Sequence, residues 1–271
     1  MPKPTIPKPT IPKTPAPEST SKPATTLTGS MFLYSRPELL NPEAHAGLGI
    51  KVVPKPFEFA AGIKAVPIVA SEFASAQKHY PIVFSSMENP MPLAVVGILE
   101  EKNLFVTSAG KWDLHAYVPA YLRCYPFALA AAEGQDQSAV VIDVGSSRVG
   151  QAPDLPFFKA GAVTAETTNM IDFCSQFARE MSITTAFCQR LKALDLLAQQ
   201  TATNTAADGK TETTVAQFIT LDMQKVNNLP PAVLQELLQN AYLSAIFAQA
   251  FSMENWTHLI NRRLIDQGIS A

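Results

Sequence analysis

The sequence predicts an α+β domain in which a short-stranded, mostly antiparallel sheet packs against C-terminal helices. Two patterns carry this prediction. Between residues 65 and 144, short apolar runs alternate with short turns, which is typical of antiparallel strands. After residue 164, apolar residues recur at steps of three and four, which is typical of amphipathic helices. Strands followed by helices, without regular alternation, favour α+β over a βαβ repeat.

The composition of the chain excludes some classes of function. The chain has 271 residues, a net charge of −2 and only 16% charged residues. We therefore expect no nucleic-acid partner, because nucleic acid requires a basic face. The N-terminus lacks the apolar core of a signal peptide, and no run of 18 apolar residues occurs, so no transmembrane segment is expected. Cytoplasmic residence is the default expectation, with export by a route that reads no N-terminal signal as the alternative.

Residues 1–30 are rich in proline and are expected to form a disordered arm before one domain that covers residues 31–271. The pentamer P-K-P-T-I occurs twice within residues 2–11, and closely spaced prolines favour an extended chain without a core. The arm carries four lysines and one glutamate, whereas the remainder has 17 basic and 22 acidic residues. A solubilising spacer and a ligand for a proline-binding module, through the P-x-x-P spacing, both remain open.

The first half of the chain contains most of the strand signals. Pro67 restricts the first strand to a sheet edge or a strand start, because proline cannot donate to a ladder. Ser71 is a candidate N-cap for a short helix that ends near residue 79, and residues 114–131 are expected to be helical. The expected strands are 65–70, 81–85, 93–99, 104–107 and 139–144.

The second half contains the helix signals. Thr164 is expected to cap a helix of about 30 residues that carries a broad apolar stripe. The small, polar segment 198–213 predicts a mobile loop, and residues 215–221 predict a strand. Pro230 and Pro231 suit the first turn of the next helix, and Ser252 is a candidate cap for the last one. The apolar face of the helix after the two prolines is expected to comprise Leu234, Leu237, Leu238, Ala241, Tyr242, Ala245 and Ile246.

The three cysteines favour buried, reduced thiols. Cys174 and Cys188 are separated by 14 positions in one expected helix, or about 21 Å, which is too far for a disulfide. Cys124 stands beside Arg123, and a cation can lower a thiol pKa, but no cysteine-protease signature surrounds it. The sequence also contains no G-x-S-x-G motif and no phosphate-binding glycine loop. Catalysis by a nucleophile is therefore disfavoured.

A metal site is likewise disfavoured. Asp113 and His115 form a D-x-H pair, and His79 or His45 could supply a third ligand. This spacing is generic and the histidines are few, so a structural role is favoured. We expect neither a metal nor another cofactor.

The strongest candidate is a ligand-binding site made of Trp112, Asp113, Tyr117, Tyr121 and Arg123. Tyrosines at 117, 121 and 125 would lie on one face of a helix. Aromatic rings beside an arginine can hold a carboxylate, a sugar or a peptide. The alternative is a packed core in which Asp113 pairs with Arg123 inside the fold.

Three blocks of sequence together resemble the SapC family of proteobacterial proteins over residues 31–263. They are V-P-I-V-A-S-E-F and H-Y-P-I-V-F-S-S at 66–73 and 79–86, the segment 103–127, and the segment 215–263. The most specific part is K-W-D-L-H-A-Y-V-P-A-Y-L-R-C-Y-P-F, although Cys124 stands where the family pattern has a second arginine. The acidic cluster that usually follows the strand at 139–144 is also missing.

The resemblance implies an association rather than a reaction. The family is named for a gene linked to a bacterial surface layer, and its members neighbour halogenase-like proteins, peptide-modifying oxygenases and TonB-dependent receptors. It supplies no catalytic residues. The expected function is a surface-layer-associated or peptide-modification role as a soluble, non-enzymatic protein that binds a ligand or a protein or peptide partner. The alternative is an enzyme that acts on a peptide or amino acid together with an oxygenase or halogenase. The oligomeric state stays open.

Overall fold

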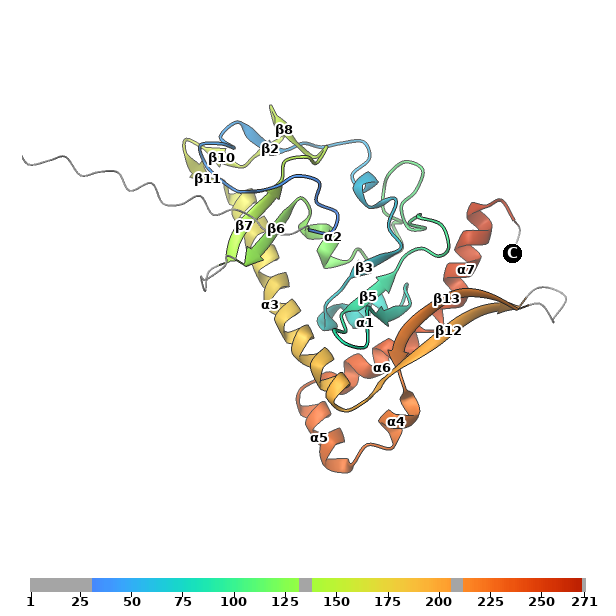
Figure 1. The fold of residues 1–271 in the computed structure, drawn as a ribbon. Helices are drawn as coiled ribbons and strands as arrows, with labels where there is room; N and C mark the ends of the chain where they lie inside the picture. The colour runs from blue at the N-terminus through green and yellow to red at the C-terminus, as the bar shows by residue number, and fades with distance from the viewer. Residues whose placement is uncertain (1–30, 132–137, 206–211, 270–271) are drawn as a thin grey trace, which may run out of the picture.

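The computed structural model describes residues 31–131, 138–205 and 212–269 (Figure 1). Segment 1–30, for which a disordered arm was predicted, lies outside the described residues. The described part is α+β, with short antiparallel strands followed by helices, so the predicted fold class is confirmed. None of the helices in these ranges is long and apolar enough to cross a membrane.

The central sheet has five antiparallel strands in the order β12-β13-β4-β5-β3. Strand β3 lies at an edge, as Pro67 predicted, because a proline in an inner strand would remove a ladder hydrogen bond. The strands are β3 (Ala65–Pro67), β4 (Ile82–Phe84), β5 (Pro92–Val95), β12 (Leu197–Thr205) and β13 (Glu212–Leu221).

The loop predicted at 198–213 is wrong over its described part. Residues 197–205 form strand β12, which pairs with β13 along its whole length in a hairpin that projects beyond β4 (Figure 1). Residues 199–201 of β12 are solvent-exposed, so the strand shows no apolar alternation that a sequence pattern could reveal. Threonine nevertheless favours extended backbone, because its branched Cβ fits the pleat.

Smaller sheets cover the other end of the molecule. Their orders are β1-β7-β6, β8-β2-β9 and β10-β11. They comprise β1 (Pro37–Leu39), β2 (Leu48–Ile50), β6 (Phe127–Ala131), β7 (Ser138–Asp143), β8 (Val149–Gln151), β9 (Leu155–Pro156), β10 (Phe158–Lys159) and β11 (Ala162–Val163).

Two local predictions before residue 131 need correction. The helix expected over 114–131 is only α2 (Ala120–Cys124), because Pro126 interrupts it and the next five residues pair with β7 as β6. The strand expected over 104–107 is reduced to one bridge between Val106 and Trp112.

The 29-residue helix α3 (Ala165–Ala193) confirms the cap predicted at Thr164, whose hydroxyl accepts the backbone N–H of Thr167. This helix crosses the molecule from β6 to α5 (Figure 1). Near its start, Cys174 packs into the core under the small sheets, whereas Phe187 and Leu191 near its end belong to the core of the central sheet. One straight element therefore joins both cores.

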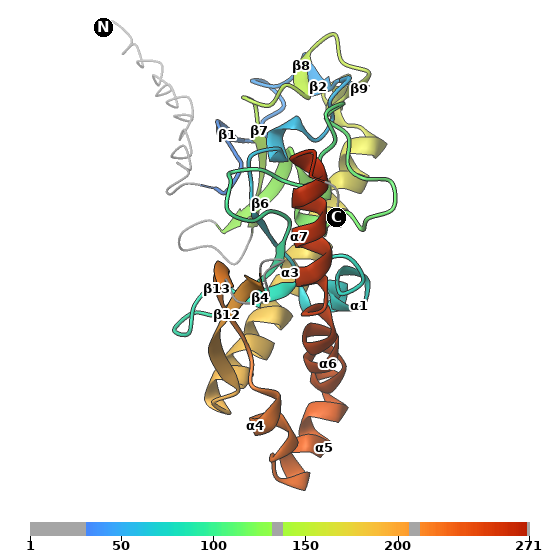
Figure 2. The same cartoon turned by 90° about the vertical axis from the view of Figure 1, so that its right-hand side faces the viewer.

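The C-terminal helices stack along one side of the central sheet (Figure 2). The start predicted at Pro230 and Pro231 is confirmed, but Ala241 adopts a left-handed φ of 59° and divides the expected continuous face between two helices. Ser252 ends the second of these rather than capping the last helix. The elements are α4 (Met223–Asn227), α5 (Pro231–Gln239), α6 (Tyr242–Ser252) and α7 (Asn255–Asp266).

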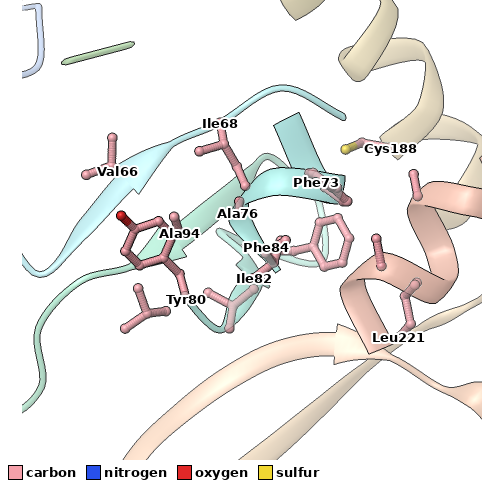
Figure 3. Close-up of a cluster of buried hydrophobic side chains, with 14 of the residues drawn as sticks. Val66, Ile68, Phe73, Ala76, Tyr80, Ile82, Phe84, Ala94, Cys188 and Leu221 are labelled. Atoms are coloured by element: carbon pink, nitrogen blue, oxygen red, sulfur yellow. The ribbon is translucent and has the colours of Figure 1, made fainter. Parts of the chain in front are cut away.

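Short helices precede β4. They are the 3₁₀ turns η1 (Glu58–Ala60) and η2 (Ala70–Glu72) and the helix α1 (Phe73–Ala76). Ser71 lies inside η2 and is not a cap; the carboxylate of Glu72 instead accepts the N–H of Val69 at 2.9 Å. Figure 3 shows Phe73 and Ala76 in the core near Ile82 of β4, together with Ile68, which follows β3.

Buried amides and hydroxyls attach α6 and α7 to the central sheet. Ile82 donates its N–H to the Ser252 hydroxyl at 2.9 Å, and its carbonyl accepts from the Gln249 amide at 2.8 Å. The Asn255 amide donates to the carbonyls of Gln77 and Tyr80. Since β4 pairs with β13 only between Phe84 and Ile219, these side chains satisfy backbone groups that the ladder leaves unpaired.

A fully buried carboxylate, Asp143, joins chain segments at one end of the β1-β7-β6 sheet. It accepts the N–H groups of Ser35, Arg36 and Gly145 at 2.8 to 3.0 Å and the hydroxyl of Tyr125 at 2.9 Å. Burial opposes ionisation, but the donated hydrogen bonds prevail and lower the pKa of Asp143. The Asp143 carboxylate therefore connects three parts of the chain, which are the segment before β1, the end of α2 and the end of β7.

Asp143→Asn is expected to lower the free energy of unfolding by about 3 kcal/mol, because an amide NH₂ would face backbone donors. Because the folded pKa lies below the unfolded value of about 3.9, this stabilisation is present above that pH and is lost as the pH falls further. Urea unfolding at pH 7 and pH 3 measures both effects. Equal acid sensitivity of parent and variant would contradict this role.

Candidate functional site

The segment 112–125 does not bring its five candidate residues to one place. Residues 113–119 form an irregular turn before α2 begins, so the chain changes direction between Asp113 and Tyr117. Trp112 and Asp113 lie toward α7, whereas Tyr117, Tyr121 and Arg123 lie toward η2 and α3. The predicted site therefore divides into two groups.

Trp112 and Asp113 serve the fold. The Trp112 side chain is buried, with its ring centroid 5.6 Å from Phe57 and 6.1 Å from Phe105. Asp113 accepts from the guanidinium of Arg262 at 2.6 Å, and that guanidinium lies 4.2 Å from the Phe105 ring centroid. The backbone N–H of His115 and the Arg262 charge lower the pKa of Asp113. Asp113 is therefore the partner of Arg262 and not of Arg123.

The D-x-H pair makes a local contact. Asp113 accepts the backbone N–H of His115 at 2.9 Å, a local turn contact. Within the described ranges, no three or more histidine, cysteine, aspartate and glutamate side chains converge as a metal-ligand group.

The second group centres on a glutamate that the sequence did not single out. Glu72 is 6% exposed, and its carboxylate accepts from the N–H groups of Val69 and Ala120 and from the Tyr117 hydroxyl, at 2.7 to 2.9 Å. Burial raises the pKa of Glu72, against the effect of these donors. Burial and the neighbouring Glu72 raise the pKa of Tyr117 to about 12, so this hydroxyl stays protonated. Glu72 thus fixes Tyr117 and the first turn of α2.

Arg123 completes this group from the solvent side. Its Nη2 donates to the Tyr117 hydroxyl at 3.0 Å, and its guanidinium carbon lies 5.6 Å from the Tyr117 ring centroid and 4.9 Å from that of Phe173. Among the described residues no carboxylate lies within 4.0 Å of its nitrogens. The aromatic rings therefore hold an exposed cation whose remaining donors face a hollow of about 190 Å³.

The other two tyrosines do not line this hollow. Tyr121 donates to the carbonyl of Phe32 at 2.6 Å, and its ring meets the edge of Phe177, a residue of the hollow. Tyr125 donates to Asp143. The expected stack of three tyrosines does not form, because α2 has only five residues and Tyr117 and Tyr125 lie outside it.

A larger hollow of about 710 Å³ lies on the α7 side, but its cations are already paired. Lys55 binds Glu58 at 2.8 Å, Lys102 binds Asp266 at 2.5 Å, and Arg262 binds Asp113 at 2.6 Å. A ligand there would have to compete with an internal carboxylate at each cation. The smaller hollow offers a cation without such competition, so we take the Glu72, Tyr117, Arg123 and Phe173 group as the candidate site.

Sequence reasoning missed two members of this group. Glu72 lies within the apolar run V-P-I-V-A-S-E-F, and a single acid in such a run is a signal for a buried, hydrogen-bonded carboxylate. Phe173 falls in the helix that was expected to carry a broad apolar stripe, and no local signal marks its contact with Arg123, because the two residues are 50 positions apart.

The fold and the site define an α+β domain that presents an arginine on aromatic rings in a small surface hollow. The chain belongs to the SapC family, whose sequence model matches residues 40–259. This match contains all four residues of the candidate site. No curated protein and no solved structure matches the chain.

The three cysteines are free and buried, and the thiols of Cys124 and Cys174 are in contact. The hydrogen bond with the Cys174 thiol raises the pKa of Cys124, and burial raises it further. The charge of the neighbouring Arg123 is therefore not enough to produce a thiolate. Burial raises the pKa of Cys188 to about 12. These environments favour protonated, unreactive thiols.

Replacing all three cysteines by serine is expected to cost about 1–3 kcal/mol for each buried hydroxyl that lacks a partner, while leaving the Arg123 hollow intact. Chemical denaturation measures the loss of stability, and binding is measured on the folded variant. Lost binding in a variant that remains folded would assign the thiols a direct role.

The Asp113–Arg262 pair is expected to act only in stability. Both side chains are partly exposed, so Asp113→Asn and Arg262→Gln should each lower the free energy of unfolding by about 1 kcal/mol. The double variant should cost less than the sum, because each single change already breaks the pair. Thermal and urea unfolding check this, and additive losses would contradict the pairing.

Proposed function

We propose that this SapC-family protein is a non-enzymatic binding protein in which Arg123 receives an anionic group of a peptide or protein partner. The observation that carries the proposal is the placement of Arg123. Asp113, its candidate internal partner, binds Arg262 instead, and Arg123 keeps one hydroxyl partner at Tyr117. An arginine fixed on two rings with unused donors is suited to bind a carboxylate by two hydrogen bonds.

The neighbouring polar groups support binding rather than proton transfer. Three donors occupy the oxygens of Glu72, so this carboxylate is committed to η2 and α2. The Tyr117 hydroxyl already donates to Glu72 and accepts from Arg123. Glu72 is only 6% exposed, and the Tyr117 proton is already donated to Glu72, so this arrangement does not favour proton transfer to a ligand in the hollow.

The size of the hollow favours a chain end or one side chain as the bound group. About 190 Å³ accommodates a carboxylate with its immediate attachment, and the walls contributed by Phe173 and Phe177 suit the apolar atoms beside it. A peptide carboxylate agrees with the surface-associated or peptide-modification systems that the family resemblance implies. The assignment to either system is part of the proposal.

Arg123→Ala is expected to abolish capture of carboxylate-bearing peptides while changing the free energy of unfolding by no more than about 1 kcal/mol, because the hydrogen bond to Tyr117 and the cation–π contacts that are lost lie at the exposed surface. The probe is a library of random pentapeptides with free C-termini, compared with the same library as C-terminal amides. Ultrafiltration with the full chain, followed by mass spectrometry, measures retention.

Arg179→Ala provides the matched control, since Arg179 is an exposed arginine on α3 that does not line the hollow. It should retain the carboxylate preference of the parent. Equal retention of acids and amides by the parent would reject the proposal. A large loss of stability in Arg123→Ala would instead assign this arginine to the fold.

A further inference from the structure

A second hollow adjoins the candidate site along α3. It has a volume of about 270 Å³ and lies between η2, α1, α3 and the start of α6. Ser71 and Glu180 line both hollows, so the two lie side by side, and together they are called the groove. Figure 1 shows α1 between α3 and α6, in agreement with the contacts of α1 with α6 and of η2 with α3.

One face of α3 forms a wall of this groove. Phe173, Phe177, Glu180 and Ile183 follow at steps of four, three and three, which places them in a row. The opposite wall includes the small residues Ser71 and Ala74 in the second hollow and Ser75 in the first. A hydrogen bond of 2.8 Å from the Ala70 N–H to Thr184 fixes η2 against α3 beneath the groove.

The chemistry changes along the row. At one end Arg123 offers unused donors. In the middle Glu180 is an acceptor that has no ion-pair partner among the described residues. At the other end Ile183, which is 53% exposed, and Tyr242 provide apolar surface. A ligand that matches this order has an acceptor, then a donor, then an apolar group.

The length of the groove favours an extended peptide among the ligands that carry an acceptor, a donor and an apolar group in this order. Phe173 and Ile183 are ten residues apart on a helix, which corresponds to about 15 Å. An extended chain advances about 3.3 Å per residue, so about five residues cover this distance. Backbone N–H groups along such a chain would meet Glu180.

We infer that the groove binds the last five residues of a peptide, with its C-terminal carboxylate on Arg123 and an apolar side chain at the fifth position from the end, between Ile183 and Tyr242. This inference rests on the proposed function for the carboxylate and adds the apolar subsite and the direction of the chain. The occupant is a peptide partner of this chemistry, because the cation at one end and the apolar surface at the other complement it.

Isothermal titration of the full chain with two unlabelled peptides tests the inference. They are acetyl-Leu-Gly-Gly-Gly-Gly and acetyl-pentaglycine, both with free carboxyl ends. The leucine peptide is expected to bind about tenfold more tightly, since it buries one further apolar side chain. Ile183→Ser should remove this advantage without changing the affinity for pentaglycine. The matched control Ile269→Ser, at an isoleucine that is 51% exposed elsewhere, should keep it.

The outcomes separate the two proposals. Equal affinities of the parent for the two peptides, with binding lost on C-terminal amidation, would overturn the apolar subsite and leave the carboxylate site standing. If C-terminal amidation does not change the affinity, both the carboxylate site and the apolar subsite are wrong. If Ile183→Ser changes only self-association in sedimentation velocity, a second copy of this chain is the occupant, and the peptide inference is wrong.

Discussion

The continuity of α3 is the constraint on which the rest of the structure depends. Thr164 fixes where the helix begins, and its 29 residues carry Cys174 into one core and Phe187 and Leu191 into the other. Because a helix is stiff over this length, the small sheets and the central sheet keep a fixed separation and orientation. The candidate groove lies on the same helix, so both hollows are held at the spacing that α3 sets.

Buried polar side chains complete the backbone where the strands are too short to do so. Asp143 binds N–H groups from the N-terminal segment, Glu72 binds those before α1 and at α2, and Ser252 and Gln249 satisfy β4. Each would be costly to bury without these partners. Glu72, Gln249 and Ser252 are thus accounted for by the fold itself, whereas Arg123 keeps unused donors.

The proposed function depends on which residues pair with Asp113 and with Arg123. Asp113 is near Arg123 in sequence, yet α7 brings Arg262 to it over the Phe105 ring. Arg123 is left on Tyr117 and Phe173, in a hollow that shares Glu180 with a second, adjacent hollow lined by Ile183. A cation, an acceptor and an apolar subsite in one row form the kind of surface that reads an extended peptide.

The sequence by itself determined the features that depend on near neighbours. The cap at Thr164, the proline start of α5, the edge position of β3 and the α+β order all follow from local sterics and periodicity. Tertiary structure alone decided the hairpin at β12, whose polar strand has no apolar alternation, and the short length of α2. It also determined the partners of Asp113, Glu72 and Arg123. The contacts of Glu72 with Tyr117 and of Asp113 with Arg262 join residues that are 45 and 149 positions apart, and the contact of Arg123 with Tyr117 depends on how the chain turns before α2. Charge and aromatic content show that an arginine needs a partner, but only the folded chain determines which one it receives.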